Sequence, residues 1–196
     1  ENGDIVDGDQ IIGLCALEMQ RAGTLVKNAV VTTPMSNIGL EITLREHGIK
    51  MVRAQVGDRY VVDTLRKEGY RLGGEQSGHI IFLEHSTTGD GVIAALKVLE
   101  AMKRTGKKLS ELKNQIRLFP QVREDVIVSR KEPFASVPEV AKAIADGEKT
   151  IHEKGRIFVR YSGTEPKARV MVEGEDLGMI QGIAKNIAST IQRHLG

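Results

Sequence analysis

Hydrophobic and polar positions along the first 118 residues alternate between the periods of helices and strands. Apolar residues at helical spacing predict helices over residues 9–21, 36–47, 60–68 and 91–103. Short β-branched or apolar runs between them predict strands over residues 26–32, 50–55 and 79–84. Strands that alternate with helices are typical of a three-layer α/β domain with a mostly parallel sheet.

Candidate capping residues mark the ends of these predicted helices. Asp9 and Ser36 are expected N-caps, because their side-chain oxygens can accept hydrogen bonds from the free N–H groups of a first turn. Gly23, Gly48 and Gly69 are expected to end three of the helices.

The pattern changes after a short predicted helix over residues 109–113. Strands are expected over residues 123–129, 156–161 and 167–173, and helices over residues 137–153 and 178–194. One helix between strands, a hairpin and a closing helix suit a small α+β domain. We therefore expect an α/β domain over residues 1–118 and an α+β C-terminal domain over residues 119–196.

Composition excludes several classes of protein. The formal net charge of +2 is too small to indicate a nucleic-acid partner. No run approaches the ~20 apolar residues that cross a bilayer, so we expect no membrane contact and a cytoplasmic location. The single cysteine, Cys15, lies in an apolar helical run, which predicts a core residue and excludes an internal disulfide.

A first candidate binding segment is Gly-Gly-Glu-Gln-Ser-Gly-His at residues 73–79. Its side chains can hydrogen-bond two neighbouring sugar hydroxyls, and its glycines allow a ligand to come close to the backbone. The candidate binding residues are Glu75, Gln76, Ser77 and Gly78. His79, the last residue of this segment, is the candidate for acid–base chemistry. A polar turn between strands is the alternative.

A second candidate segment is Arg-Tyr-Ser-Gly-Thr-Glu-Pro-Lys-Ala-Arg at residues 160–169. Backbone N–H groups in such a turn can form an anion-binding nest, and an arginine fork matches phosphate oxygens. The candidate phosphate-binding residues are Arg160, Ser162, Gly163, Thr164 and Arg169. A hairpin turn with surface charges is the alternative.

A third candidate segment covers residues 56–61, where Asp58 and Arg59 stand between a predicted strand and a helix. Ligands of α/β sheets bind beyond the carboxyl ends of strands, although Asp58 could equally cap the helix and Arg59 could be solvated. Asp4, Asp7 and Asp9 lack the spacing of a calcium loop, and the five histidines lack the helical spacing of a zinc site. We expect no metal ligands in this chain.

Together these segments resemble the α-D-phosphohexomutase family, whose members have four domains. Residues 73–79 are similar to the sugar-specificity loop of the third domain, and residues 160–166 are similar to the phosphate-binding loop of the fourth. Gln76, the 56–61 segment and Thr-Thr-Gly-Asp-Gly at residues 87–91 most resemble members that act on glucosamine phosphates. Tyr161 departs from this pattern, since many of those members carry proline there.

The resemblance implies a mechanism in which a phosphoserine on the first domain transfers its phosphoryl group to the sugar phosphate. Glucosamine 6-phosphate and glucosamine 1-phosphate would interconvert through a glucosamine 1,6-bisphosphate intermediate. Mg²⁺ would be held by three aspartates of the second domain together with the phosphoserine. Neither the serine motif nor that aspartate loop occurs in this sequence.

The resemblance also implies roles for the residues that are present. Glu75 and Ser77 would hold adjacent ring hydroxyls, while Arg160, Ser162, Thr164 and Arg169 would hold the phosphate that does not react. We expect the chain to be the C-terminal half of such a mutase, with the missing N-terminal domains and a sugar phosphate as its partners, and to be inactive alone. A phosphomannomutase or phosphoglucomutase, and a non-catalytic sugar-phosphate-binding module, are the alternatives.

Overall fold

The computed structural model describes residues 1–152 and 155–196, which form two compact units, Glu1–Leu118 and Phe119–Gly196. The predicted end of one helix at Glu153 lies outside the described residues. Among the helices that are described, none is long and apolar enough to cross a bilayer. Each unit has its own hydrophobic core and is described separately below.

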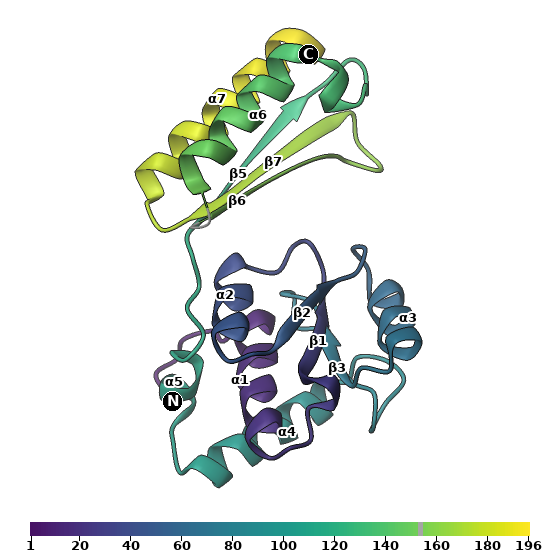
Figure 1. Ribbon diagram of the computed structural model, residues 1–196, viewed down its shortest axis with the longest axis vertical. Helices are drawn as coiled ribbons and strands as arrows, with labels where there is room; N and C mark the ends of the chain where they lie inside the picture. Colours follow the sequence, from purple (N-terminus) through teal and green to yellow (C-terminus); the bar gives the residue numbers. More distant parts are fainter. Residues whose placement is uncertain (153–154) are drawn as a thin grey trace. The chain divides into compact units, whose positions relative to one another are not determined.

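The first unit contains a four-stranded sheet in the order β2-β1-β3-β4 (Figure 1). The strands are β1 (Ala29–Thr32), β2 (Lys50–Arg53), β3 (Leu72–Gly74) and β4 (Ile80–Phe82). Strands β2 and β3 pair with β1 in parallel, and β4 pairs with β3 in antiparallel orientation. The predicted mostly parallel sheet is confirmed.

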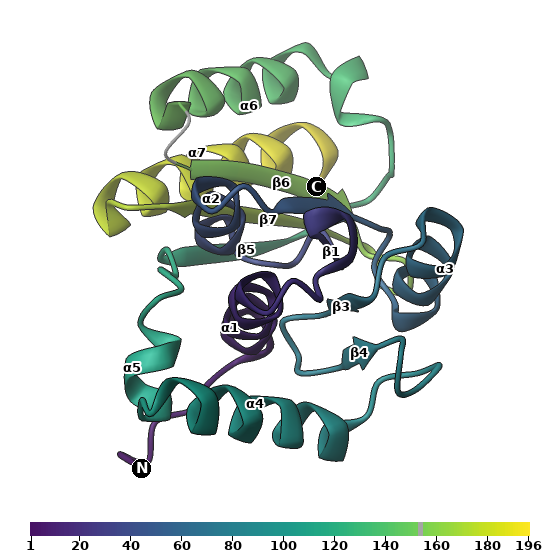
Figure 2. The ribbon, with the colours of Figure 1, turned by 60° about the horizontal axis from the view of Figure 1, so that its bottom comes forward.

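Helices cover both faces of this sheet (Figure 2). They are α1 (Gly8–Arg21), α2 (Ile38–Glu46), α3 (Asp58–Glu68) and α4 (Gly91–Thr105), and the short α5 (Leu109–Lys113) packs on α1 and α4. Successive residues of a strand point to opposite faces. Val30 therefore packs with α1, α2 and α4, whereas Val31 packs with Val61 and Leu65 of α3. The result is the predicted three-layer arrangement.

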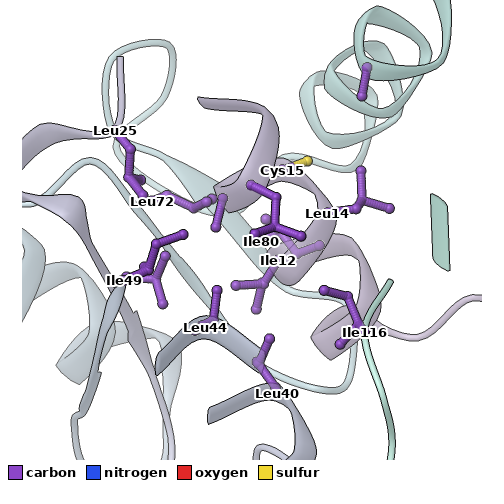
Figure 3. Packing of buried hydrophobic residues seen from close by; sticks show 14 of the residues in the cluster. Ile12, Leu14, Cys15, Leu25, Leu40, Leu44, Ile49, Leu72, Ile80 and Ile116 are labelled. Atoms are coloured by element: carbon purple, nitrogen blue, oxygen red, sulfur yellow. The ribbon is translucent and has the colours of Figure 1, made fainter. Parts of the chain in front are cut away.

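The larger core of the first unit lies between the sheet and α1 (Figure 3). Ile12, Leu40, Leu44 and Leu72 are all fully buried there. Burying such a side chain contributes about 1.5–3 kcal/mol relative to leaving it exposed. Cys15 belongs to the same cluster as a buried free thiol, as predicted for a core residue.

Two predicted helix caps were wrong. The N-cap of α1 is Asp7, whose side chain accepts a hydrogen bond from the Gln10 N–H while the Gln10 side chain binds back to Asp7. Asp9 instead lies in the first turn and is buried. The N-cap of α2 is Asn37 and not Ser36, because the Asn37 side chain accepts from the Gly39 N–H at 2.9 Å.

One predicted strand is shorter than expected. Residues Val26–Asn28 form a 3₁₀ turn, and β1 begins at Ala29. Lys27 and Asn28 have positive φ angles of 58° and 44°, which are incompatible with a strand. Gly23, Gly48 and Gly69 follow α1, α2 and α3 in left-handed conformations, so the three predicted stops are confirmed.

The second unit is a three-stranded antiparallel sheet with helices on one face. Its order is β5-β7-β6, and its elements are β5 (Gln121–Ile127), α6 (Pro138–Ile151), β6 (Gly155–Tyr161), β7 (Lys167–Gly174) and α7 (Leu177–Leu195), with a short 3₁₀ helix at Phe134–Ser136. Val159, Val170 and Ile187 share its core. This arrangement is the expected α+β fold.

Candidate functional site

Three loops follow the carboxyl ends of the parallel strands and meet at one edge of the first sheet. They comprise residues 33–37 after β1, 54–57 after β2 and 75–79 after β3. Strand β2, which follows β1 in the sequence, lies on one side of β1, and β3 lies on the other side. Open α/β sheets bind ligands at such a change of direction, so the gap between the first and third loops is the expected site.

The 75–79 loop is a tight turn. The Glu75 N–H donates to the His79 carbonyl at 3.1 Å, and the Gly78 N–H donates to the Glu75 carbonyl at 3.0 Å. Gly78 has a φ of 95°, which a residue with a side chain rarely adopts. Ser77 is exposed and Gln76 is partly buried.

The side chain of Glu75 is held by a hydrogen bond from a neighbouring loop. Its carboxylate accepts a hydrogen bond from the Gly57 N–H at 3.1 Å. The backbone of the 54–57 loop therefore holds the carboxylate, while one side-chain oxygen keeps free acceptor capacity for a ligand hydroxyl.

Asp58 and His79 are brought together beside Glu75. His79 Nε2 lies 3.5 Å from Asp58 Oδ2, which is the range of an ion pair. The histidine ring packs on Gly89, where a β-carbon would lie only 2.6 Å from Nε2. Asp58 is the first residue of α3 and Gly57 is its N-cap, so the alternative of an Asp58 cap was wrong. Arg59 is exposed, and its Nε lies 3.8 Å from Asp63 Oδ2.

A set of buried polar residues at the end of β1 and in the loop after it was not predicted from the sequence to border the site. These residues are Thr32, Thr33, Ser36 and Asn37. Arg53, at the end of β2, donates to the carbonyls of Thr33 at 2.9 Å and Ser36 at 3.0 Å. The signal that could have revealed them is the polar run Thr-Thr-Pro-Met-Ser-Asn between a strand and a helix.

In the second unit, the turn between β6 and β7 carries the candidate phosphate-binding residues. The Ser162 N–H donates to the Lys167 carbonyl at 2.8 Å, and the Ser162 hydroxyl accepts from the Glu165 N–H at 3.2 Å. Ser162 is buried by these contacts, whereas Gly163 and Thr164 are exposed at the tip. The turn is thus closed by its own backbone and presents two small residues outward.

Arg160 and Arg169 face each other on neighbouring strands at the base of this turn. Val159 and Val170 pack against the helices, so the two arginines point to the opposite face of the sheet. Burial, together with the charges of Arg169 and Arg123, lowers the pKa of Arg160 below its usual value. Within the described part of the chain, no carboxylate lies at ion-pair distance from Arg160.

The described residues offer no metal site. Among them, no group of three His, Cys, Asp or Glu side chains could hold an ion. Asp4 pairs with Lys113 at 2.9 Å, Asp7 caps α1, and Asp9 accepts from the Asn37 N–H. The three aspartates therefore make separate contacts and do not form a loop around a cation.

Comparison with known proteins decides the family. Residues 7–119 match the family described as phosphoglucomutase/phosphomannomutase, alpha/beta/alpha domain III, and residues 125–190 match its C-terminal domain. The chain belongs to the phosphoglucomutase/phosphomannomutase family. It is 50% identical over 196 residues to a phosphoglucosamine mutase of Syntrophotalea carbinolica and 52% identical over 197 residues to one of Caldanaerobacter subterraneus.

These relatives are longer than the chain. All of the chain is aligned, but it spans 43% and 44% of the two relatives. The fold is also that of Aspergillus fumigatus N-acetylphosphoglucosamine mutase in complex with GlcNAc-6P and magnesium, with a TM-score of 0.76 at 19% identity over 98% of this chain and 45% of that one. A family member from Burkholderia thailandensis gives a TM-score of 0.73 at 19% identity, over 98% of this chain and 43% of that one.

Proposed function

We propose that this chain is the sugar-recognising and phosphate-binding part of a phosphoglucosamine mutase. The complete protein would interconvert glucosamine 6-phosphate and glucosamine 1-phosphate in the cytoplasm. The observation that carries the proposal is the Glu75 carboxylate, which the Gly57 N–H holds at the carboxyl edge of the parallel sheet. The 50% identity to phosphoglucosamine mutases over the whole chain favours glucosamine phosphates over other hexose phosphates.

Glu75 and Ser77 are proposed to bind two neighbouring ring hydroxyls, with Gln76 and Gly78 completing the loop around the sugar. A carboxylate accepts hydrogen bonds and a serine hydroxyl both donates and accepts, so the pair can bind hydroxyls in either orientation of the ring. The same two side chains would then serve both half-reactions, in which the sugar presents its two ends in turn.

Asp58 and His79 are proposed to act next to this hydroxyl site. A carboxylate attracts the 2-ammonium group that distinguishes glucosamine from glucose, and Arg59 adds a cation at the start of the same helix. His79, 3.5 Å from Asp58, is the candidate to move a proton to or from a sugar oxygen.

The turn between β6 and β7 is proposed to bind the phosphate that does not react. Arg160 and Arg169 supply positive charge and hydrogen-bond donors, while Ser162, Gly163 and Thr164 supply hydroxyl and backbone groups. Binding of a remote phosphate orients the reacting end of the sugar and contributes to the rate of transfer.

The described residues do not fit a magnesium site. We therefore propose that Mg²⁺, the phosphoserine and the exchange through glucosamine 1,6-bisphosphate belong to parts of the complete protein outside this chain. On that basis the isolated chain has no turnover of its own, with or without Mg²⁺ and the bisphosphate.

The test compares the complete protein with two variants. Wild-type protein should convert glucosamine 6-phosphate with a higher kcat/KM than glucose or mannose phosphates. Glu75→Ala should lose at least ten-fold in kcat/KM, because an aligned acceptor for ring hydroxyls is removed. Glu84→Ala, which changes an exposed glutamate after β4, is the matched control and should retain wild-type kinetics.

Three results would contradict this proposal. A preference for glucose or mannose phosphates would make the protein a phosphoglucomutase or phosphomannomutase. Wild-type kinetics in a correctly folded Glu75→Ala protein would show that Glu75 does not bind the sugar. Absence of turnover with every hexose phosphate would instead favour a non-catalytic binding module.

A further inference from the structure

The first turn of α1 contacts both loops that border the expected binding gap. The Gly8 N–H donates to the Gln76 carbonyl in the 75–79 loop at 3.0 Å. The next residue, Asp9, accepts from the Asn37 N–H in the 33–37 loop at 2.7 Å through Oδ2. Two consecutive residues thus connect the two loops, which are separated by about 40 residues in the sequence.

Gly8 fits this place because it has no side chain. A β-carbon there would overlap the Glu75 carbonyl oxygen and would lie 2.8 Å from both the Gln76 carbonyl oxygen and the Gly78 nitrogen. All three atoms belong to the backbone of the 75–79 loop, so no side-chain rotation could relieve the overlap. Any larger residue at position 8 must displace the loop that carries Glu75.

Asp9 is a charged residue with no exposed surface. Burying a carboxylate is costly unless hydrogen bonds compensate for the lost water. Its Oδ2 accepts from the Asn37 N–H, and its place in the first turn of α1 is where acidic side chains are favoured. A buried acid with these partners fixes the start of α2 relative to α1.

We propose that Gly8 and Asp9 are positioning residues that set the spacing between the 33–37 and 75–79 loops, and so hold Glu75 where it meets the sugar ring. This inference rests on the proposed function of Glu75. Neither residue needs to touch the substrate. Their effect passes through the loop backbone on one side and through Asn37 on the other.

The decisive variant is Gly8→Ala in the complete protein. Alanine is a better helix former than glycine, so α1 itself should be retained, but the 75–79 loop must move. KM for the hexose phosphate should rise at least ten-fold. Inhibition by inorganic phosphate, which reports on the arginine site of the other unit, should stay within two-fold of wild type.

Gly182→Ala is the matched control. Gly182 also lies in a helix, α7, but a β-carbon there would meet no atom within 4 Å. The control should keep wild-type KM. At the other position, Asp9→Asn retains an oxygen acceptor for the Asn37 N–H, whereas Asp9→Ala does not. Asp9→Asn should therefore show only a small part of the rise in KM that Asp9→Ala causes.

A second measurement does not depend on turnover. Amide hydrogen exchange of residues 75–79, followed by mass spectrometry, should be at least ten-fold faster in Gly8→Ala than in Gly182→Ala. Unchanged exchange in folded Gly8→Ala would overturn the positioning role, as would an unchanged KM in an active enzyme. Faster exchange in a protein that converts no hexose phosphate would support the contact and reject the proposed function instead.

Discussion

Arg169 donates to the carboxylate of Glu165 at 2.8 Å, four residues before it in the turn between β6 and β7. The other oxygen of this carboxylate accepts from Lys167, also at 2.8 Å. A carboxylate with two cationic donors occupies the kind of place that a phosphate would take. Glu165 is therefore an internal competitor for any anion that approaches Arg169.

We expect Glu165→Gln to strengthen anion binding. Removing the negative charge releases Lys167 and one guanidinium nitrogen of Arg169 from Glu165, although Asp125 Oδ2 stays 4.0 Å from Arg169 Nε. Inorganic phosphate should therefore inhibit the complete protein several-fold more strongly. Glu148→Gln, on the exposed face of α6, is the control and should leave inhibition unchanged. Weaker inhibition in Glu165→Gln would mean that the carboxylate orients Arg169 and does not compete with phosphate.

The same competition predicts a dependence on pH. Hydrogen bonds from Lys167 and Arg169 lower the pKa of Glu165 below its usual 4.5. The carboxylate therefore remains charged, and its ion pairs remain formed, above pH 4.5; they are lost only as the pH falls through the lowered pKa. Phosphate inhibition of wild-type protein should approach that of Glu165→Gln only in this acidic range.

Arg169→Ala should reduce kcat/KM of the complete protein by about ten- to a hundred-fold or more. A hydrogen bond to a charged group contributes roughly 1.5–3 kcal/mol, and the arginine fork supplies more than one donor. Arg169→Lys should recover part of the loss, because lysine keeps the charge without the planar fork. Arg193→Ala on α7 is the control, and wild-type kinetics in a folded Arg169→Ala protein would favour a plain charged hairpin.

Asp58→His should shift substrate preference toward glucose or mannose phosphates. The change replaces a carboxylate 3.5 Å from His79 with a group that repels a 2-ammonium group when protonated. The measurement is the ratio of kcat/KM for glucosamine 6-phosphate to that for glucose 6-phosphate. Asp63→His, one turn further along the same helix and exposed, should leave this ratio unchanged. An unchanged ratio in Asp58→His would limit Asp58 to a structural role.

Cys15 should be unreactive in the folded chain. Burial raises the pKa of its thiol from 9.0 to about 12, so the reactive thiolate is absent at neutral pH. A chromogenic disulfide reagent at pH 8 should therefore modify Cys15 only after unfolding. Above pH 9 the unfolded state releases a proton that the folded state retains, so stability should fall with pH by up to about 1.4 kcal/mol per unit. Cys15→Ala should lack this part of the pH dependence.

Sequence patterns predicted most elements because each has a strong local signal. Two examples are the glycines that end α2 and α3 and the β-branched residues of β1. Each of these residues determines the backbone conformation only of the few positions around it. The capping of α1 was also a local signal: Asp7 and Gln10 have the spacing of a capping box, and Asp9 only appeared to be the cap because it stands next to the apolar run.

The contacts that shape the candidate site could not be predicted in the same way. Gly8 meets Gln76, and Gly57 meets Glu75, because the order of the strands brings distant loops to one edge of the sheet. Each contact joins a backbone group to a loop far along the chain, and nothing local distinguishes these glycines from others. The residue pattern supplied the candidates Glu75 and Arg169 and the resemblance supplied their roles, whereas the structure supplied their partners.

The two arginines at the base of the β6–β7 turn are suited to anion binding but lower the stability of the sheet. Arg160 and Arg169 stand directly opposite each other, and like charges in this relation weaken a sheet. Threonine at position 160 would relieve the repulsion and favour the strand. A laboratory selection for heat resistance alone would therefore tend to discard Arg160, whereas retention of Arg160 under a selection that also requires activity would mark the turn as a place where ligand binding outweighs stability.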